Sequence, residues 1–280
     1  MTIDAEQAKR EFEQSYRALL SYRYFGKGNI HLDRGVEREL MPLRRDMRNS
    51  TGGIMASPLC IAAIEPWWLD YQGIAAMVAP VTMTYSVIDP AYDVREIEVI
   101  RDVISVGRQM GFSRAQVVDA QDRERLIAIS TGSGFDLGVV PEGFEPIDNP
   151  VHHFDDDTEL PPLRDVFGVR SDDDGSLVID QLTPELGAPN RALHQGPINI
   201  IMEAAAIDAL GRSQGSVDFQ VDHWTVQFIK PGDTGPFRAT AAVRAGRGGF
   251  RCGVDVTLVD DGRDGRTIAN VSSLFTRVDR

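Results

Sequence analysis

One stretch of the sequence, RALHQGPINIIMEAAAIDAL at residues 191–210, combines residue types that can do acyl chemistry. His194 and Gly196 come directly before an apolar run, and a single glutamate, Glu203, lies within that run. A buried carboxylate is costly unless it is paired or used. Glu203 is therefore a candidate general base or nucleophile. Pro197 suits the first position of a helix and has no N–H to donate, so the backbone N–H of Gly196 or Ile198 is the candidate donor to a carbonyl oxygen.

The helix expected in this stretch also allows a simpler interpretation. A glutamate within a helix is more often solvated than catalytic, and a loop histidine often caps backbone groups. Glu203 lies three or four positions from Ile200 and Ile207, which favours a partly buried face. Asp208 lies five positions after Glu203, about 140° around the helix. The two carboxylates therefore cannot share one face, and we expect Asp208 to be structural.

The sequence repeats this pattern with an offset of 143 residues. RNSTGGIM in the first half matches RALHQGPI in the second, and each is followed by an apolar helix and four long alternating runs. An offset near half the chain length indicates a tandem duplication. The first copy has Cys60 where the second has Glu203, and Thr51 where the second has His194. The apolar setting of Cys60 favours a buried, inert thiol, so we expect the first half to lack its own catalytic group.

The loops and helices are positioned by runs of alternating apolar and polar residues, which are typical of half-buried strands. Glycine-rich turns between the later runs predict antiparallel hairpins. Long strands beside one apolar helix predict an α+β fold, in which each half is a long antiparallel sheet wrapped around a central helix. We expect an N-terminal helix over 4–20, strands over 74–88, 94–108, 112–121, 125–134, 217–229, 236–247, 249–260 and 266–277, and weaker strands over 36–45 and 165–182.

The second half resembles the hotdog-fold acyl-CoA thioesterases. In that family a pattern like N-x-x-x-HGG opens the central helix, and a carboxylate follows about two turns later. Asn190, His194 and Gly196 match the pattern, Gln195 stands in place of its first glycine, and Glu203 follows nine residues after the histidine. That spacing is similar to the glutamate-using hydroxybenzoyl-CoA and phenylacetyl-CoA thioesterase branch. The stretches FIKPG and AGRGGFRCGVDV resemble the strand ends of the family.

The resemblance implies a double hotdog whose halves pair as an intramolecular pseudo-dimer, with a further homo-oligomer allowed. It divides the chain into an N-terminal helix over 1–28, a first hotdog domain over 29–138, a linker over 139–163 and a second, catalytic hotdog domain over 164–280. It implies thioester hydrolysis at a single site between the halves, with Glu203, His194 and Gly196 as catalytic groups. The substrate-binding residues that it implies are Asn190, Gln195, Ile198, Asn49, Thr51, Gly53 and, for the phosphates of CoA, Arg247 and Arg251.

The composition argues against several classes of protein. The formal net charge of −13 disfavours binding to nucleic acid. The two cysteines form no CxxC pattern, which argues against a disulfide framework or a zinc site, and we expect no cofactor other than the CoA part of the substrate. No apolar run approaches the roughly 20 residues of a membrane span, and the polar N-terminus is not a secretory signal. We expect a cytoplasmic protein whose partner is an acyl-CoA or acyl-carrier-protein thioester, with no membrane or nucleic-acid partner.

Two other functions remain open at this point. The segment IDNPVHHFD, from Asp148 to Asp155, is similar to the D-x-N-P-x-H pattern of hotdog hydratases that act on enoyl or hydroxyacyl thioesters. Its aspartate stands next to the asparagine, however, and no long apolar helix follows it. The other alternative is a non-catalytic acyl-CoA or lipid-binding protein, because one copy lacks the glutamate and the other has Gln195 in its loop.

Overall fold

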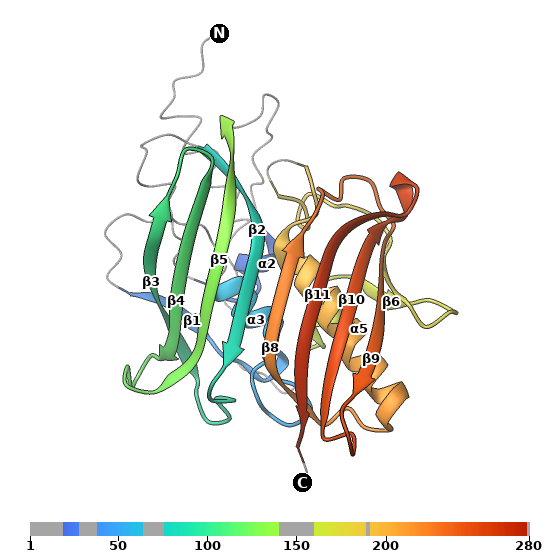
Figure 1. The fold of residues 1–280 in the computed structure, drawn as a ribbon, viewed down its shortest axis with the longest axis horizontal. Helices are drawn as coiled ribbons and strands as arrows, with labels where there is room; N and C mark the ends of the chain where they lie inside the picture. The colour runs from blue at the N-terminus through green and yellow to red at the C-terminus, as the bar shows by residue number, and fades with distance from the viewer. Residues whose placement is uncertain (1–18, 28–37, 64–75, 140–159, 189–190, 279–280) are drawn as a thin grey trace.

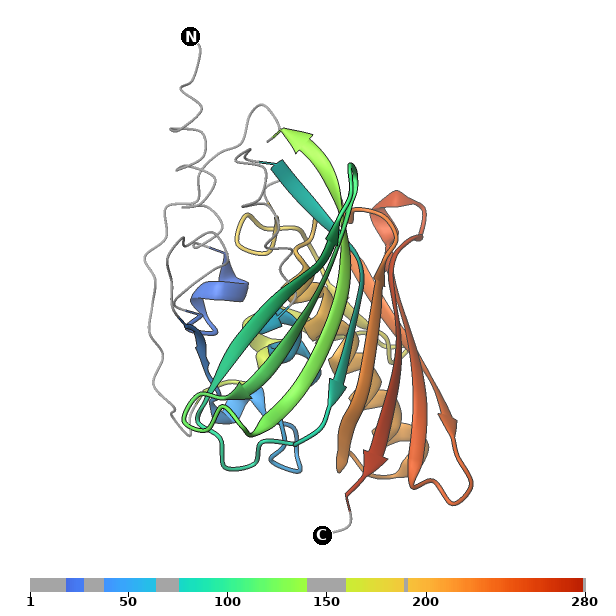
Figure 2. The same ribbon diagram turned by 60° about the vertical axis from the view of Figure 1, so that its left-hand side comes forward.

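The fold is a single sheet with its helices gathered on one side. The computed structural model describes residues 19–27, 38–63, 76–139, 160–188 and 191–278. Within these residues, eleven strands form one sheet in the order β1-β3-β4-β5-β2-β8-β11-β10-β9-β7-β6. The helices α3 and α5 lie behind the same face of this curved sheet, together with the short helices α2 and α4 (Figure 1). The turned view shows α5 inside the curve of the sheet (Figure 2).

The elements have the following bounds. The strands are β1 Glu39–Pro42, β2 Ala76–Val87, β3 Glu96–Val106, β4 Met110–Asp119, β5 Leu126–Val139, β6 Val169–Ser171, β7 Leu177–Ile179, β8 Phe219–Phe228, β9 Phe237–Ala245, β10 Arg251–Asp260 and β11 Arg266–Arg277. The α-helices are α2 Leu20–Arg23, α3 Ala56–Ala63, α4 Leu163–Val166 and α5 Gln195–Gln214. Two short 3₁₀ helices are η1 Arg45–Met47 and η3 Asp261–Arg263.

The eight long strands confirm the alternation seen in the sequence, with ends that differ by a few residues. In β10, for example, Val254, Val256 and Leu258 are buried while Asp255 is exposed, as expected where one face of a sheet covers a core. The predicted strand over 36–45 is shorter and is β1. The predicted strand over 165–182 is not continuous, because this segment contains the end of α4 and two short strands, β6 and β7, that form a hairpin. Its chain direction changes at Gly168 and Gly175, both of which have a positive φ that favours glycine.

The sheet has its centre where β2 pairs with β8. On one side the order outward is β2-β5-β4-β3-β1, and on the other it is β8-β11-β10-β9-β7, so the two sides repeat the same sequence of connections. Met83 of β2 pairs with Val226 of β8 in an antiparallel register, and these residues are 143 positions apart, which is the offset of the sequence repeat. The strands of the two halves therefore meet at positions separated by the offset seen in the sequence.

Helix α5 is buried around most of its circumference because it lies between the sheet, α3 and α4. It begins after His194, which is its N-cap, and ends at Gly215, whose φ of 68° suits the left-handed C-cap conformation. A polar bridge ties the helix to the centre of the sheet. The indole N–H of Trp224 donates to Asn199 Oδ1 at 2.9 Å, and Asn199 Nδ2 donates to the carbonyl of Gln195 at 2.8 Å. These bonds satisfy polar groups that would otherwise be buried alone.

Helix α3 is much shorter, with eight residues, all of them buried. Pro58 falls in its first turn, where its missing N–H is not needed for a helical bond. The position of α3 confirms the apolar helix expected after the RNSTGGIM loop.

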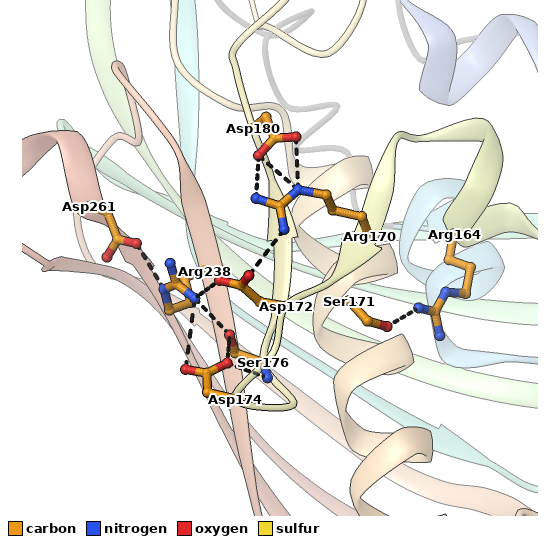
Figure 3. A network of polar contacts seen from close by, with 9 residues as sticks. All are labelled: Arg164, Arg170, Ser171, Asp172, Asp174, Ser176, Asp180, Arg238 and Asp261. Atoms are coloured by element: carbon orange, nitrogen blue, oxygen red, sulfur yellow. Dashed lines mark hydrogen bonds and ion pairs between the residues drawn. The ribbon is translucent and has the colours of Figure 1, made fainter.

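The β6–β7 hairpin is attached to the edge of the sheet by a network of charged groups (Figure 3). Arg170 pairs with Asp180 at 2.7 Å and with Asp172 at 3.3 Å. Arg238 of β9 pairs with Asp172 at 2.7 Å and with Asp261 of η3 at 2.8 Å. The alternating charges fix the short hairpin on β9, which protects that edge of the sheet.

Several expectations lie partly or wholly outside the described residues. They are the N-terminal helix over 4–20 as far as residue 18, most of the linker over 139–163, Asn190, and the IDNPVHHFD segment. The described part of the chain contains no helix that is long and apolar enough to cross a membrane.

Candidate functional site

The carboxylate of Glu203 lies at the start of the helix that belongs to the other half of the chain. Its Oε1 accepts the backbone N–H of Ala56 at 2.6 Å, and its Oε2 accepts the backbone N–H of Ser57 at 2.7 Å. These are the first two residues of α3, where free N–H groups and the positive end of the helix dipole favour an anion. Glu203 is 2% exposed. The glutamate is therefore buried at the junction of the two halves, as a partner of two backbone donors.

The protonation of Glu203 is shifted by this environment. Burial raises the pKa of its carboxyl above the usual value, because water no longer solvates the charged form, while the Ser57 hydroxyl and then the N–H groups of Ser57 and Ala56 oppose the rise. Among the described residues, no cationic side chain forms an ion pair with it. The Ser57 hydroxyl is buried beside the carboxylate and lowers its pKa, although the two groups are not aligned as a full hydrogen bond. A buried base and a hydroxyl thus lie together at a helix N-terminus.

The opposite end of α3 is held by cations. Lys27 Nζ donates to the carbonyl of Ile61 at 3.3 Å, and Arg101 donates to the carbonyls of Ala62 and Ala63 at 2.8 and 3.2 Å. Both cations also pair with Glu39, at 3.0 Å for Lys27 and 2.6 Å for Arg101. Cations at the C-terminal carbonyls and an anion at the N-terminal N–H groups both stabilise the helix dipole. These contacts hold the short helix rigidly in front of Glu203.

A cavity of about 420 Å³ opens beside the start of α3. Its walls come from the η1 loop, from α4 and from one face of α5. Ile200 and Ala204 line it on either side of Glu203 along α5, and Met55 lines it directly before the first residue of α3. The wall of the cavity thus includes the chain neighbours of Glu203 and Ala56, although Glu203, Ala56 and Ser57 do not line it themselves.

A wider hollow of about 710 Å³ lies at the β4–β5 turn and does not reach these groups. It is lined by Arg38 and Arg123, and both donate to the buried carboxylate of Glu98. The hollow is lined by residues 120–124 of the turn itself, apart from Arg38. Its own carboxylates, Asp122 and Glu124, are exposed on the turn, whereas Glu203 is buried, so the cavity beside α3 is the candidate site.

The structure does not bring Glu203 to the N-terminus of its own helix. Glu203 lies seven residues after Gly196, which is about 10 Å along α5. His194 is buried instead against α2, with Ser21 Oγ 3.0 Å from its Nδ1 and the Tyr22 hydroxyl 3.4 Å from its Nε2. A side chain on Gly196 would come within 2.1 Å of Ser21 Oγ. The α5 N-terminus is thus filled by protein, and His194 acts there as the helix N-cap.

The other predicted residues of the second loop lie in this filled region. Gln195 and Ile198 are both buried, and neither lines the cavity. Both amide atoms of Gln195 lack a hydrogen-bond partner among the described residues. Asn190 is outside the described part of the chain.

The predicted residues of the first loop hold the loop against β8. Asn49 Nδ2 donates to Gln220 Oε1 at 2.8 Å, while its own Oδ1 accepts from Thr51 and Gly53. A side chain on Gly53 would come within 1.9 Å of Gln220 Oε1 and would displace Gln220 from its bonds to Asn49 and Ile54. Of these loop residues Asn49 also lines the cavity, whereas Thr51 and Gly53 do not.

Arg247 and Arg251 lie at the β9–β10 turn and do not line the cavity. Arg251 is exposed and pairs with Asp222 at 3.3 Å. Cys60 is fully buried in α3, and burial together with the nearby Glu203 carboxylate raises the pKa of its thiol well above the usual value. It is therefore a poor nucleophile in this state, as its apolar sequence setting predicts.

Sequence reasoning missed the partners of Glu203, which are the backbone donors of Ala56 and Ser57. No spacing within one half indicates them, because the contact depends on how the two halves pack. The only available signal is the repeat itself. If two equivalent helices pack antiparallel, a residue two turns into one lies near the start of the other.

Within the described residues, no group of three or more His, Cys, Asp or Glu side chains could hold a metal ion. The site therefore consists of a carboxylate, a hydroxyl and backbone N–H groups beside an apolar cavity. These groups can orient a carbonyl and activate water or attack it directly.

Comparisons with known proteins agree with this architecture. No protein-family model matches the sequence, and no curated protein matches it significantly. Among solved structures, a protein of unknown function with a hotdog fold from Alicyclobacillus acidocaldarius is 11% identical over 89% of this chain and 96% of its own, with a TM-score of 0.54. The TesB protein of Mycobacterium avium subspecies paratuberculosis is 10% identical over 88% and 95%, with a TM-score of 0.56. The 12:0-ACP thioesterase of Umbellularia californica is 12% identical over 86% and 94%, with a TM-score of 0.52. At these identities the likeness concerns the fold alone, and this chain has a hotdog fold.

Proposed function

We propose that the protein hydrolyses acyl thioesters of coenzyme A or of an acyl carrier protein, with Glu203 as the base or nucleophile. The observation that carries this proposal is the convergence of Glu203 with the N–H groups of Ala56 and Ser57. A buried carboxylate without a cation, held at a helix N-terminus beside a cavity, has the composition of an acyl-transfer site. The thioesterases among the proteins of similar fold support the same class of substrate.

We propose further that the chain is a double hotdog whose halves form an intramolecular pseudo-dimer. The matching strand orders on the two sides of the β2–β8 pair support this arrangement, as does the pairing of Met83 with Val226. In this arrangement the carboxylate comes from the second half and the backbone donors from the first. The first half, which has Cys60 in place of the glutamate, thus contributes to the single site through its helix N-terminus.

The proposed reaction requires one of the two backbone donors to change its partner. One N–H group must release Glu203 and bind the thioester carbonyl oxygen, where it stabilises the negative charge that develops on attack. The freed carboxylate oxygen takes a proton from water as the water oxygen bonds to the acyl carbon. The carbon–sulfur bond then breaks, and the leaving thiolate takes that proton from Glu203. The products are a carboxylic acid and a free thiol. The same carboxylate could instead attack the acyl carbon directly, and water would then hydrolyse the anhydride.

A raised pKa suits Glu203 to this role. A carboxylate with an ordinary pKa is a weak base at neutral pH, and burial brings its proton affinity closer to that of the groups it must deprotonate. The Ser57 hydroxyl, which lies beside Glu203 without a well-aligned hydrogen bond, is placed to bond the attacking water or the carbonyl oxygen. The site therefore contains both the base and a polar group that can orient the second reactant.

A panel of acyl-CoA thioesters tests the proposal, with the released thiol as the readout. Glu203→Gln should lower kcat/KM by about a hundredfold or more, because general base catalysis contributes roughly 10²–10⁴ in rate. Asp255→Asn is the matched control, since Asp255 lies on the outer face of β10 and pairs with Arg244 and Ser272. Equal activity of Glu203→Gln and the wild type would refute the assignment of Glu203.

One observation favours a second candidate function, a non-catalytic acyl-CoA or lipid-binding protein. Both oxygens of Glu203 already accept backbone N–H groups, so the carboxylate also satisfies the requirements of a structural helix cap. Under this alternative the wild type would bind acyl-CoA and release no thiol from any member of the panel. Turnover that depends on Glu203 would exclude it.

A further inference from the structure

We infer that the cavity beside α3 is the binding site for the acyl group and that it accepts an uncharged aliphatic chain of short to medium length. The inference rests on the proposed thioester hydrolysis for its biological meaning. Its physical basis is an apolar cavity whose wall includes Ala204 and Met55, the chain neighbours of Glu203 and Ala56, and this basis is independent of turnover.

The walls of the cavity are mainly apolar. Ile200, Ala204 and Ile207 lie at spacings of four and three residues on α5 and so form one helical face toward the cavity. Leu163 of α4 and Val217 close it from other directions. Its volume of about 420 Å³ lies in the lower part of the range for small-molecule sites, roughly 300–1,000 Å³. An aliphatic chain therefore fits, whereas a complete CoA molecule does not.

The cavity is placed so that a bound chain would present its thioester to the base. Ala204 adjoins Glu203, and Met55 adjoins Ala56, whose N–H holds the carboxylate. A chain lying along Ile200 and Ala204 would bring its carbonyl end to the start of α3. The polar part of the substrate would then remain outside the cavity.

Two arginines at the edge of the cavity already bond to other groups of the protein. Arg164 pairs with Asp208 at 3.1 Å and donates to Ser171 at 3.0 Å; Figure 3 shows the latter bond. Arg48 donates to the backbone carbonyls of Leu43, Gly52, Ala91 and Val94. Side chains paired in this way have little capacity left for a phosphate, and an uncharged ligand is favoured.

The N-terminus of α5 corresponds to that of α3 in the repeat, and side chains of the protein fill the space beside it. At the N-terminus of α5, Ser21 lies against Gly196 and His194, and Ile61 of α3 approaches the same point. Ile61 stands 143 positions before Ala204, so the two residues occupy equivalent places in the repeat. Tyr22 and Phe25, from the segment that includes α2, are both buried nearby in the same core. The chain thus closes one of the two positions with its own side chains and leaves the other open for a ligand.

Two variants of opposite effect test the inference. Ala204→Phe should fill the cavity, and Ile207→Ala should enlarge it. We would measure kcat/KM for saturated acyl-CoA thioesters of increasing length, and the affinity for the corresponding S-alkyl-CoA thioethers, which cannot be hydrolysed. Ala242→Phe is the matched control, because Ala242 is an exposed residue of β9. Thermal unfolding would show that each variant folds.

We expect Ala204→Phe to weaken binding of the longer thioethers by about tenfold or more, since pocket contacts of this size commonly discriminate by 10–200-fold. It should also move the preferred thioester to shorter chains, while Ile207→Ala moves it to longer chains. Hydrolysis with an unchanged length profile in both variants would overturn the inference and leave the proposed function intact. Thioether binding that Ala204→Phe abolishes, without any hydrolysis by the wild type, would support the inference and overturn the proposed function. Absence of both binding and hydrolysis would overturn both.

Discussion

Glu203 of α5 and Ser57 of α3 meet at the boundary between the two halves of the chain, with Glu203 Oε2 2.7 Å from the Ser57 nitrogen. The bond joins residues that are 146 positions apart in the sequence. The same carboxylate is thus a candidate base and the N-terminal cap of a helix. Stability and activity should therefore both depend on it, and they can be separated by the choice of substitution.

Removal of the Glu203 side chain should destabilise the protein. Glu203→Ala leaves two buried N–H groups without an acceptor, and we expect a loss of about 1–3 kcal/mol in the free energy of unfolding. Urea unfolding followed by circular dichroism measures this value. Asp208→Ala on the same helix is the control and should cost less than about 1 kcal/mol, since Asp208 belongs to a partly exposed ion pair. Equal losses in the two variants would contradict the cap.

The rate should depend on pH through the carboxyl of Glu203. Its pKa is raised above the usual 4.5 by burial, and only the ionised form can act as a base. We expect kcat/KM to rise with pH through a midpoint that lies above 4.5. In Glu203→Gln the residual rate should lack this rise. A midpoint at or below the ordinary value for a glutamate would disagree with the buried environment.

The N-terminus of α5 should be a structural site. Gly196→Ala would place a methyl group 2.1 Å from Ser21 Oγ, and we expect a loss of about 1–3 kcal/mol in the free energy of unfolding from overpacking. Ser21→Gly removes the opposing atoms and should restore most of that loss in the double variant. The double variant should hydrolyse the substrate at the wild-type rate. Activity that stays low despite restored stability would instead support the catalytic role of Gly196 that the sequence predicts.

Glu98 should protect the fold against mild acid. Hydrogen bonds from Arg123, and then from Arg38, lower the pKa of its carboxyl from 4.5 to about 2. Because the folded-state pKa is depressed, this stabilisation is complete above about pH 4.5 and is lost as the pH falls toward 2. Both arginines are partly exposed, so we expect only about 1–2 kcal/mol.

The difference in unfolding free energy between the wild type and Glu98→Gln, measured at several pH values, tests this prediction. The difference should be constant near neutrality and should shrink below pH 4.5. A difference that stays constant down to pH 2.5 would rule out the depressed pKa.

Both thiols should be inert in the native protein. Cys60 and Cys252 are buried, and burial raises the pKa of each. We expect neither to react with a disulfide reagent until the protein is denatured, when two thiols should be detected. Cys60→Ser should keep hydrolytic activity. Rapid labelling of one thiol in the native protein, together with loss of turnover, would indicate a cysteine mechanism.

The sequence was sufficient to predict the long strands and the two central helices. Alternation and glycine turns located β8 to β11 because these features act over a few residues. The prediction of one strand over 165–182 relied on the same kind of short-range pattern, and here that pattern was not sufficient. The apolar residues of this segment suggest one strand, but the positive φ of Gly168 and Gly175 divides it into a helix and a hairpin. Such backbone angles are set by contacts that the sequence pattern does not contain.

The candidate site was predicted in part. Glu203 stood out because it is a lone carboxylate in an apolar helix, and the repeat showed that its counterpart is Cys60. The helix end that it would face could not be predicted, since this depends on how α3 and α5 pack. The sequence likewise does not indicate that Ser21 and Tyr22 contact His194 and cover it. Contacts between distant segments, rather than residue types, decide which helix N-terminus stays open.

The pairing of β2 with β8 has a consequence for how the protein is made. During synthesis β2 emerges from the ribosome well before β8, and its free edge can meanwhile pair with strands of other molecules. The backbone donors of Ala56 and Ser57 must also wait for Glu203, which is translated much later. A fragment that ended between the halves would keep both defects permanently. The nascent first half should therefore be a client for chaperones until the second half arrives.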